Sequence, residues 1–185
     1  MLTTRYIRSC AFTGHRPSKF PWKSNEGDAR GVALKEVLME QITALAEAGV
    51  RDFCSGMAEG TDCYCSQIVL ALREKNPALK LHCILPHKGQ ADKWGASSRD
   101  LYRSILEQAD SIVYVSRAYY KNCMLDRNRF LIDHASTVLA VFSGVRRSGT
   151  GATVNYARKM GREIIVINPI TLDIAHESST LDTKL

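Results

Sequence analysis

A run of four residues at the end of an apolar stretch combines side chains that suit an anionic ligand. The apolar stretch spans residues 6–13 and is followed at once by a bare glycine, an imidazole and a guanidinium. A guanidinium can hold a phosphate through two hydrogen bonds, and an imidazole can donate a hydrogen bond or take up a proton near neutral pH. A plain turn would need only the glycine. The candidate ligand-binding residues here are Thr13, Gly14, His15 and Arg16.

A second stretch, "SGMAEGTD" at residues 55–62, leads from a strand-like run into a helical pattern. Its two glycines would let backbone N–H groups approach a ligand closely, although an ordinary strand-to-helix turn with a good cap has the same pattern. Asp62 would compete with a phosphate so near a helix start, so we expect it to face a ribose or a base, unless it only caps the helix. The candidate residues are Ser55, Gly56, Met57, Glu59, Gly60 and Asp62.

The stretch "SGVRRSGTGATVNYA" at residues 143–157 is the better phosphate candidate. Glycines, hydroxyl side chains, two arginines and the positive end of a predicted helix coincide there. The spacings of G-x-x-x-x-G-K-[ST] and of G-x-G-x-x-G are both absent, and a merely flexible glycine loop is the alternative. The candidate residues are Gly149, Thr150, Gly151 and Thr153.

Two further pairs of residues complete the candidate site. Gln90 and Trp94 lie four positions apart after a strand-like run, and the indole would either stack on a base or cover the core. Arg127 and Asn128 stand near the start of a predicted helix.

The elements that must position these candidate residues are short β-rich runs, which alternate along the chain with longer helical patterns. The runs are 6–13, 50–55, 81–86, 111–116, 136–143 and 163–168, and the helical patterns are 30–48, 61–75, 98–109, 124–135 and 151–161, with Ser97 placed to cap the third. This order predicts an α/β fold, a three-layer Rossmann-like parallel sheet with helices on both faces. Ligands bind such sheets at the carboxyl ends of the strands. Most of the candidate residues come just after a predicted strand, so we expect them to lie at this edge of the sheet.

The chain length and composition favour a single soluble domain. We expect one Rossmann-like domain over residues 1–170 and a polar tail over 171–185, as a short helix, a partner contact or a disordered segment. No apolar run approaches a membrane span and the first residues lack a signal-peptide core, so we expect a cytoplasmic protein. The six cysteines lack zinc spacing, so we expect reduced thiols and no metal site. The formal net charge of +6 favours anionic partners.

These motifs resemble the YpsA-like branch of the SLOG superfamily. The resemblance rests on "TGHRP", "SGMAEGTD", the Q-x-x-x-W spacing at 90–94, the "RNRFLIDHAS" stretch that ends at Ser136 and the glycine–threonine loop at 149–153. It implies a Rossmann-like fold, a nucleotide or ADP-ribose-like ligand, homo-oligomer formation and a role in bacterial stress or cell division. Related branches are the LOG-type phosphoribohydrolases and the protein DprA, which binds single-stranded DNA.

The first function that we expect is binding, or sensing, of a nucleotide or nucleotide-derived ligand. The alternative is a phosphoribohydrolase that cleaves nucleoside monophosphates, with His15, Glu59 and Asp62 as candidate acid and base groups. LOG-type enzymes have a glutamate in the glycine-rich loop, whereas this chain has no Asp or Glu between Asp133 and Glu163. Single-stranded nucleic acid is an unlikely partner by this reasoning, because the basic clusters are confined to residues 5–23 and 146–162, which are expected to flank one pocket.

Overall fold

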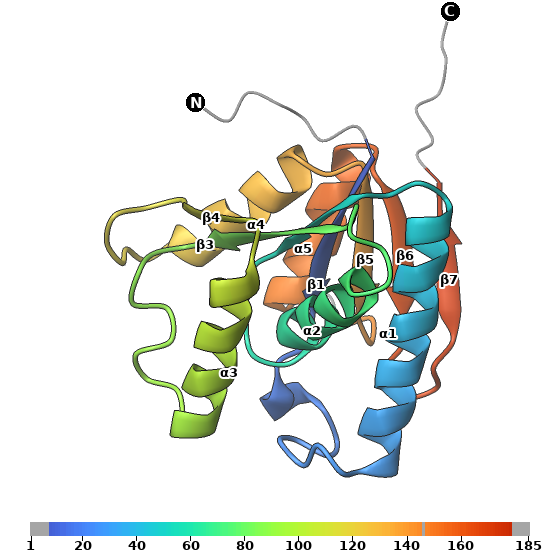
Figure 1. Cartoon of the computed structure of the whole chain (residues 1–185), viewed down its shortest axis with the longest axis horizontal. Coiled ribbons are helices and arrows are strands. Elements are labelled where there is room, and N and C mark those ends of the chain that lie inside the picture. Colours follow the sequence, from blue (N-terminus) through green and yellow to red (C-terminus); the bar gives the residue numbers. More distant parts are fainter. Residues whose placement is uncertain (1–7, 146, 179–185) are drawn as a thin grey trace, which may run out of the picture.

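A seven-stranded sheet forms the centre of the protein (Figure 1). The structure is a computed structural model that describes residues 8–145 and 147–178. The strands are β1 (Ser9–Gly14), β2 (Asp52–Ser55), β3 (Lys80–Leu85), β4 (Ser111–Tyr114), β5 (Thr137–Val141), β6 (Glu163–Ile167) and β7 (Ile174–Glu177). The helices are η1 (Pro17–Lys19), a 3-10 helix, and α1 (Ala29–Glu47), α2 (Thr61–Arg73), α3 (Ala96–Gln108), α4 (Cys123–Asp133) and α5 (Gly149–Lys159).

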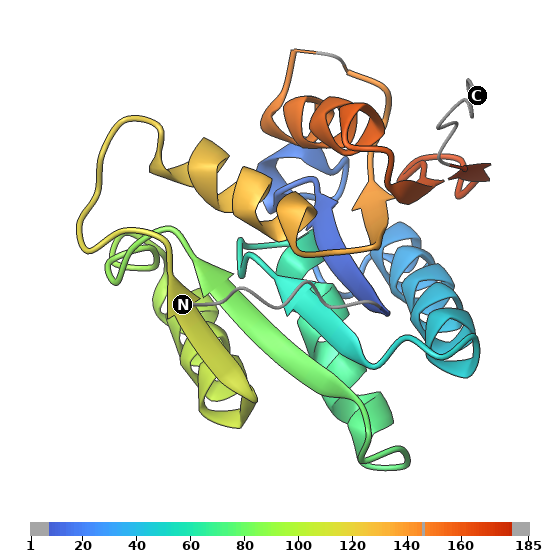
Figure 2. The same ribbon diagram turned by 90° about the horizontal axis from the view of Figure 1, so that it is seen from above.

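Side chains alternate between the two faces of the sheet, and each face is covered by helices. In β1, Cys10 and Phe12 join the core under α1, α2 and α3, whereas Ala11 packs with Leu131 of α4. The residues of α5 pack with β5 and β6 on the same face as α4. Figure 2 shows the three layers from above. The predicted fold class, a three-layer α/β sheet with helices on both faces, is confirmed.

The strand order places a topological switch point beside β1. The order is β4-β3-β2-β1-β5-β6-β7, and every neighbouring pair is parallel except β6 and β7. The chain therefore builds the sheet outward from β1 in one direction through β2–β4 and in the other through β5–β7. The carboxyl ends of β1 and β5 diverge into separate loops, which leaves room for a ligand there.

Two details differ from the sequence-based expectations. Residues 174–177, in the predicted tail, form the antiparallel edge strand β7 against β6. Helix α3 begins at Ala96, two residues before the start that a cap at Ser97 would set. Its N-cap is Gly95, which makes no side-chain hydrogen bond. In the ranges 8–145 and 147–178, no helix has the length and apolarity to cross a membrane.

Candidate functional site

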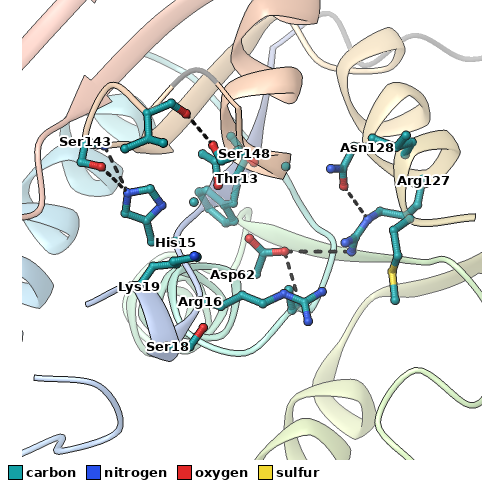
Figure 3. A pocket seen from close by; sticks show the side chains of 18 of the residues that line it. Thr13, His15, Arg16, Ser18, Lys19, Asp62, Arg127, Asn128, Ser143 and Ser148 are labelled. Carbon is teal, nitrogen blue, oxygen red and sulfur yellow. Dashed lines mark hydrogen bonds and ion pairs between the residues drawn. The ribbon is translucent and has the colours of Figure 1, made fainter. Parts of the chain in front are cut away.

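A pocket of about 430 Å³ opens at the switch point between β1 and β5. Its walls come from the end of β1, η1, the start of α2, the first turns of α4, and the segment that leads from β5 into α5 (Figure 3). The volume falls within the range of roughly 300–1,000 Å³ that small-molecule sites occupy. The predicted residues that line it are Thr13, Gly14, His15, Arg16, Asp62, Arg127, Asn128, Gly149 and Thr150.

Two glycines fit the end of β1 tightly against the start of α2. A Cβ on Gly14 would lie 2.4 Å from Thr61 Oγ1, and one on Gly60, whose φ is +87°, would lie 2.7 Å from the carbonyl oxygen of His15. That carbonyl accepts hydrogen bonds from the Thr61 backbone N–H at 3.3 Å and the Thr61 hydroxyl at 3.0 Å. The contact fixes the position of the residues that follow β1 relative to α2.

A buried ion pair forms the floor of the pocket on the α4 side. Asp62 Oδ2 lies 4.0 Å from Arg127 Nη1 and accepts a hydrogen bond from the Ala58 backbone N–H at 3.1 Å. Arg127 also donates to the Gly56 carbonyl and, at 2.9 Å, to the side chain of Asn128. Burial raises the pKa of Asp62, against the opposing effects of Arg127, the Ala58 N–H and Arg16. Burial likewise lowers the pKa of Arg127, against the effect of Asp62. Each charge of the pair therefore depends on its partner.

Three exposed cations surround the opening. They are Arg16, Lys19 and Arg147, and within the described part of the chain none of them forms an ion pair. The N-terminus of α5 reaches the same space, where Ser148 caps the helix by accepting a hydrogen bond from the Gly151 N–H at 3.0 Å. Unpaired N–H groups in the first turn add a partial positive charge. The opening therefore carries an excess of positive charge.

His15 is held between aromatic rings and faces Ser143, which follows β5. Its Nε2 lies 2.8 Å from Ser143 Oγ and also accepts a hydrogen bond from the Ser143 backbone N–H at 3.2 Å. The rings of Phe20 and Phe142 pack edge-on against the imidazole. Burial, followed by the charge of Lys19, lowers the pKa of His15.

Several predicted residues do not line the pocket but support it. Gln90 donates through Nε2 to the carbonyls of Gly56 at 3.1 Å and Met57 at 2.6 Å, which orders the loop after β2. Trp94 packs edge-on against Tyr102 at the core and does not reach the pocket. The predicted residues outside the pocket lining are Ser55, Gly56, Met57, Glu59, Gly60, Gln90, Trp94, Gly151 and Thr153.

The pocket also contains residues that the sequence reasoning did not single out. Lys19 and Ser143 line it together with Ser18 and apolar side chains of α4. Ser148, one of the hydroxyl side chains of the predicted phosphate loop, lines it as well, and a serine directly before a helical pattern is a typical N-cap. The sequence did not distinguish between the two neighbouring arginines of this loop. Arg147 lines the pocket, whereas Arg146 lies outside the described residues.

The pocket is poor in carboxylates and offers no cluster of metal ligands among the described residues. Asp62 is the one carboxylate among the lining residues that the structure describes, and Glu59 is not among them. Over residues 8–145 and 147–178, no cluster of three or more His, Cys, Asp or Glu side chains is placed to hold a metal ion. The described cysteines are free thiols, all buried.

The fold is that of a Rossmann-like α/β protein with its pocket at the switch point of the sheet. The model of the YspA SLOG family (YpsA) matches residues 10–172, and the chain belongs to this family. A UPF0398 protein of Bacillus pumilus (strain SAFR-032) is 30% identical over 139 residues, covering 74% of each chain. The SPbeta prophage-derived protein YoqJ of Bacillus subtilis (strain 168) is 33% identical over 164 residues, covering 77% of this chain and 94% of its own. The resemblance seen in the motifs is confirmed.

Two solved structures of DNA processing protein A share the fold. The protein from Streptococcus pneumoniae matches with a TM-score of 0.57 and 17% identity over 89% of this chain. The one from Helicobacter pylori, described by its single-stranded DNA binding mode, matches with a TM-score of 0.58 and 18% identity over 86%. This chain spans 52% and 65% of their lengths. The expectation that nucleic acid is an unlikely partner was wrong, because a protein with this fold binds single-stranded DNA.

Proposed function

We propose that the protein binds a nucleotide or a nucleotide-derived anion in the pocket between β1 and β5. The observation that carries the proposal is the convergence of Arg16, Lys19, Arg147 and the N-terminus of α5 on one opening. Phosphate groups are the anions that such a combination of guanidinium groups and helix N–H groups binds best. Membership of the SLOG family and the position at the switch point support the same reading.

The two sides of the pocket suggest how the ligand lies. The phosphates would face Arg147 and the start of α5, whereas the Arg16 side chain reaches toward Asp62 and Arg127 (Figure 3). Asp62 lies on the α4 side beside Arg127, so a ligand hydroxyl or amino group could donate to its carboxylate there. A ligand with a phosphate at one end and donors at the other, as in a nucleotide, matches this division.

Calorimetric titration with AMP, ADP, ATP and ADP-ribose tests the proposal. Each hydrogen bond to a charged group contributes roughly 1.5–3 kcal/mol, so Arg16→Ala or Arg147→Ala should weaken binding by about 10- to 100-fold. The matched control is Arg103→Ala, an exposed arginine on α3 outside the pocket, which should bind as the unaltered protein does. Equal affinity in all three variants would place the ligand elsewhere.

Single-stranded nucleic acid is a second candidate ligand, favoured by the surface beside the pocket. The loop from β4 to α4 exposes Tyr119, which is 68% exposed and whose ring packs edge-on against His87. Tyr120 is 41% exposed, and Arg117 and Lys121 are exposed in the same loop. Exposed rings interleaved with cations are the features on which bases stack and phosphates bind. The Helicobacter pylori neighbour, described by its single-stranded DNA binding, supports this candidate.

Fluorescence anisotropy with a labelled thymidine oligonucleotide tests the second candidate. Stacking contributes roughly 1–3 kcal/mol per base, so Tyr119→Ala with Tyr120→Ala should weaken binding by at least tenfold. The matched control replaces both by phenylalanine, which keeps the stacking surface and should retain affinity. Affinity should also fall steeply with salt. Equal binding by the alanine and phenylalanine pairs would exclude these rings.

A further inference from the structure

The contact between Ser143 and His15 determines which imidazole nitrogen carries the proton. A backbone N–H can only donate, and that of Ser143 points at His15 Nε2 from 3.2 Å. Nε2 must therefore be the unprotonated nitrogen of a neutral ring, with the proton on Nδ1. The Ser143 hydroxyl, 2.8 Å from the same nitrogen, then donates to it. This is the arrangement of a serine nucleophile and its general base.

The surroundings hold the pair in this state. His15 is 6% exposed, and Phe20 and Phe142 pack edge-on against its imidazole, each with its ring centre 6.2 Å away. Apolar packing fixes the ring orientation, a function that an acidic residue performs in many serine hydrolases. The burial that lowers the pKa of His15 keeps the ring neutral near pH 7. Ser143 itself is exposed at the pocket wall.

We propose that Ser143 is a nucleophile activated by His15, and that it acts on a phosphoryl group of the ligand in this pocket. The substrate class, a phosphoester or phosphoanhydride, rests on the proposed function. In the first step, Ser143 Oγ forms a bond to phosphorus, its proton moves to His15 Nε2, and the bond from phosphorus to the leaving oxygen breaks. The leaving oxygen takes the proton from Nε2. Water then attacks the phosphoserine, His15 again accepts a proton, and free phosphate leaves as Oγ is reprotonated.

The rest of the pocket suits the charge that develops in such a step. Negative charge grows on the phosphoryl and leaving oxygens, and Arg16, Arg147 and the first-turn N–H groups of α5 line the same space. These groups come from the two loops that also carry His15 and Ser143. Attack and charge stabilisation would therefore take place in one location.

A fluorophosphonate probe tests the dyad without requiring the natural ligand. The probe bonds to an activated serine as the P–F bond breaks and fluoride leaves, and intact-mass and peptide analysis locate the adduct. We expect one adduct at Ser143, no adduct in Ser143→Ala, and labelling slowed by about 100-fold or more in His15→Gln. The control Ser97→Ala, an exposed serine on α3, should label as the unaltered protein does. The labelling rate should fall as His15 becomes protonated at acid pH.

The outcomes separate this proposal from the binding proposal. Labelling of Ser143 with no binding of any nucleotide would uphold the dyad and refute the nucleotide site. Nucleotide binding with no adduct, or with adducts spread over several serines at equal rates, would overturn the dyad. Thermal unfolding shows whether each variant is folded. If His15→Gln is not folded, the comparison between Ser143→Ala and the unaltered protein decides, because Ser143 is exposed and its replacement removes only a hydroxyl.

Discussion

Replacing Arg127 by methionine would leave the carboxylate of Asp62 buried without its partner. The arginine is 4% exposed, and it donates hydrogen bonds to the Gly56 carbonyl and to Asn128 besides facing Asp62. Breaking one half of a buried ion pair costs about 3–5 kcal/mol, because an uncompensated charge remains. For a domain of this size, that loss lowers the melting temperature by roughly 6–20 °C.

The loss should depend on pH in a direction that the buried carboxylate dictates. Burial raises the pKa of Asp62 above its ordinary 3.8. At pH values between the unfolded and the folded pKa, Asp62 is therefore protonated in the folded protein and ionised in the unfolded chain. The free energy of unfolding falls as the pH rises through this interval. Without the positive charge of Arg127 the pKa of Asp62 rises further. The deficit of the variant should thus be largest at pH values above the raised pKa of Asp62, where the carboxylate is ionised, and shrink on acidification.

Urea unfolding of four proteins measures this coupling: the unaltered chain, Arg127→Met, Asp62→Asn and the double variant. The double variant should be more stable than Arg127→Met by at least about 1 kcal/mol, since no unpaired carboxylate remains. A loss below about 1 kcal/mol in Arg127→Met, or an identical loss with and without Asp62→Asn, would refute the reasoning.

Three other changes have outcomes that the contacts predict. Gly14→Ala should cost about 1–3 kcal/mol by urea unfolding, because its Cβ would force Thr61 away from the His15 carbonyl. Ser148→Ala should lower the free energy of unfolding by about 1 kcal/mol, because α5 loses its N-cap. Unfolding followed by circular dichroism measures this loss, and an unchanged free energy of unfolding would contradict the cap. The free energy of unfolding of the unaltered protein should decline as the pH falls below 6.5. The pKa of His15 is lower in the folded protein than in the unfolded chain, so acid protonates this histidine in the unfolded chain first and favours unfolding. His15→Gln should lack that part of the decline.

The sequence was sufficient to predict the layers because apolar runs and helical patterns alternate without exception from residue 9 to residue 167. It did not indicate β7, where three of the four residues are exposed and no apolar alternation exists. A short antiparallel edge strand needs only backbone pairing, which leaves little trace in residue types.

The candidate site was predictable in part, for a similar reason. Residues directly after β1 and at the start of α5 can be read from glycines and caps that follow strands. The pairing of His15 with Ser143 joins positions 128 apart, and it depends on β5 lying beside β1 with Gly14 opposite Val141. Gln90 and Trp94 point inward to support a loop and the core, a direction that polarity and spacing alone did not reveal.

Native mass spectrometry of the protein with an excess of AMP, ADP, ATP or ADP-ribose, beside the variant that combines Arg16→Ala and Arg147→Ala, tests the anion pocket most directly. We predict a one-to-one complex with at least one of these ligands, lost in the double variant and retained in Arg103→Ala. A complex that persists undiminished in the double variant, or the absence of any complex with the unaltered protein, would contradict the proposed site.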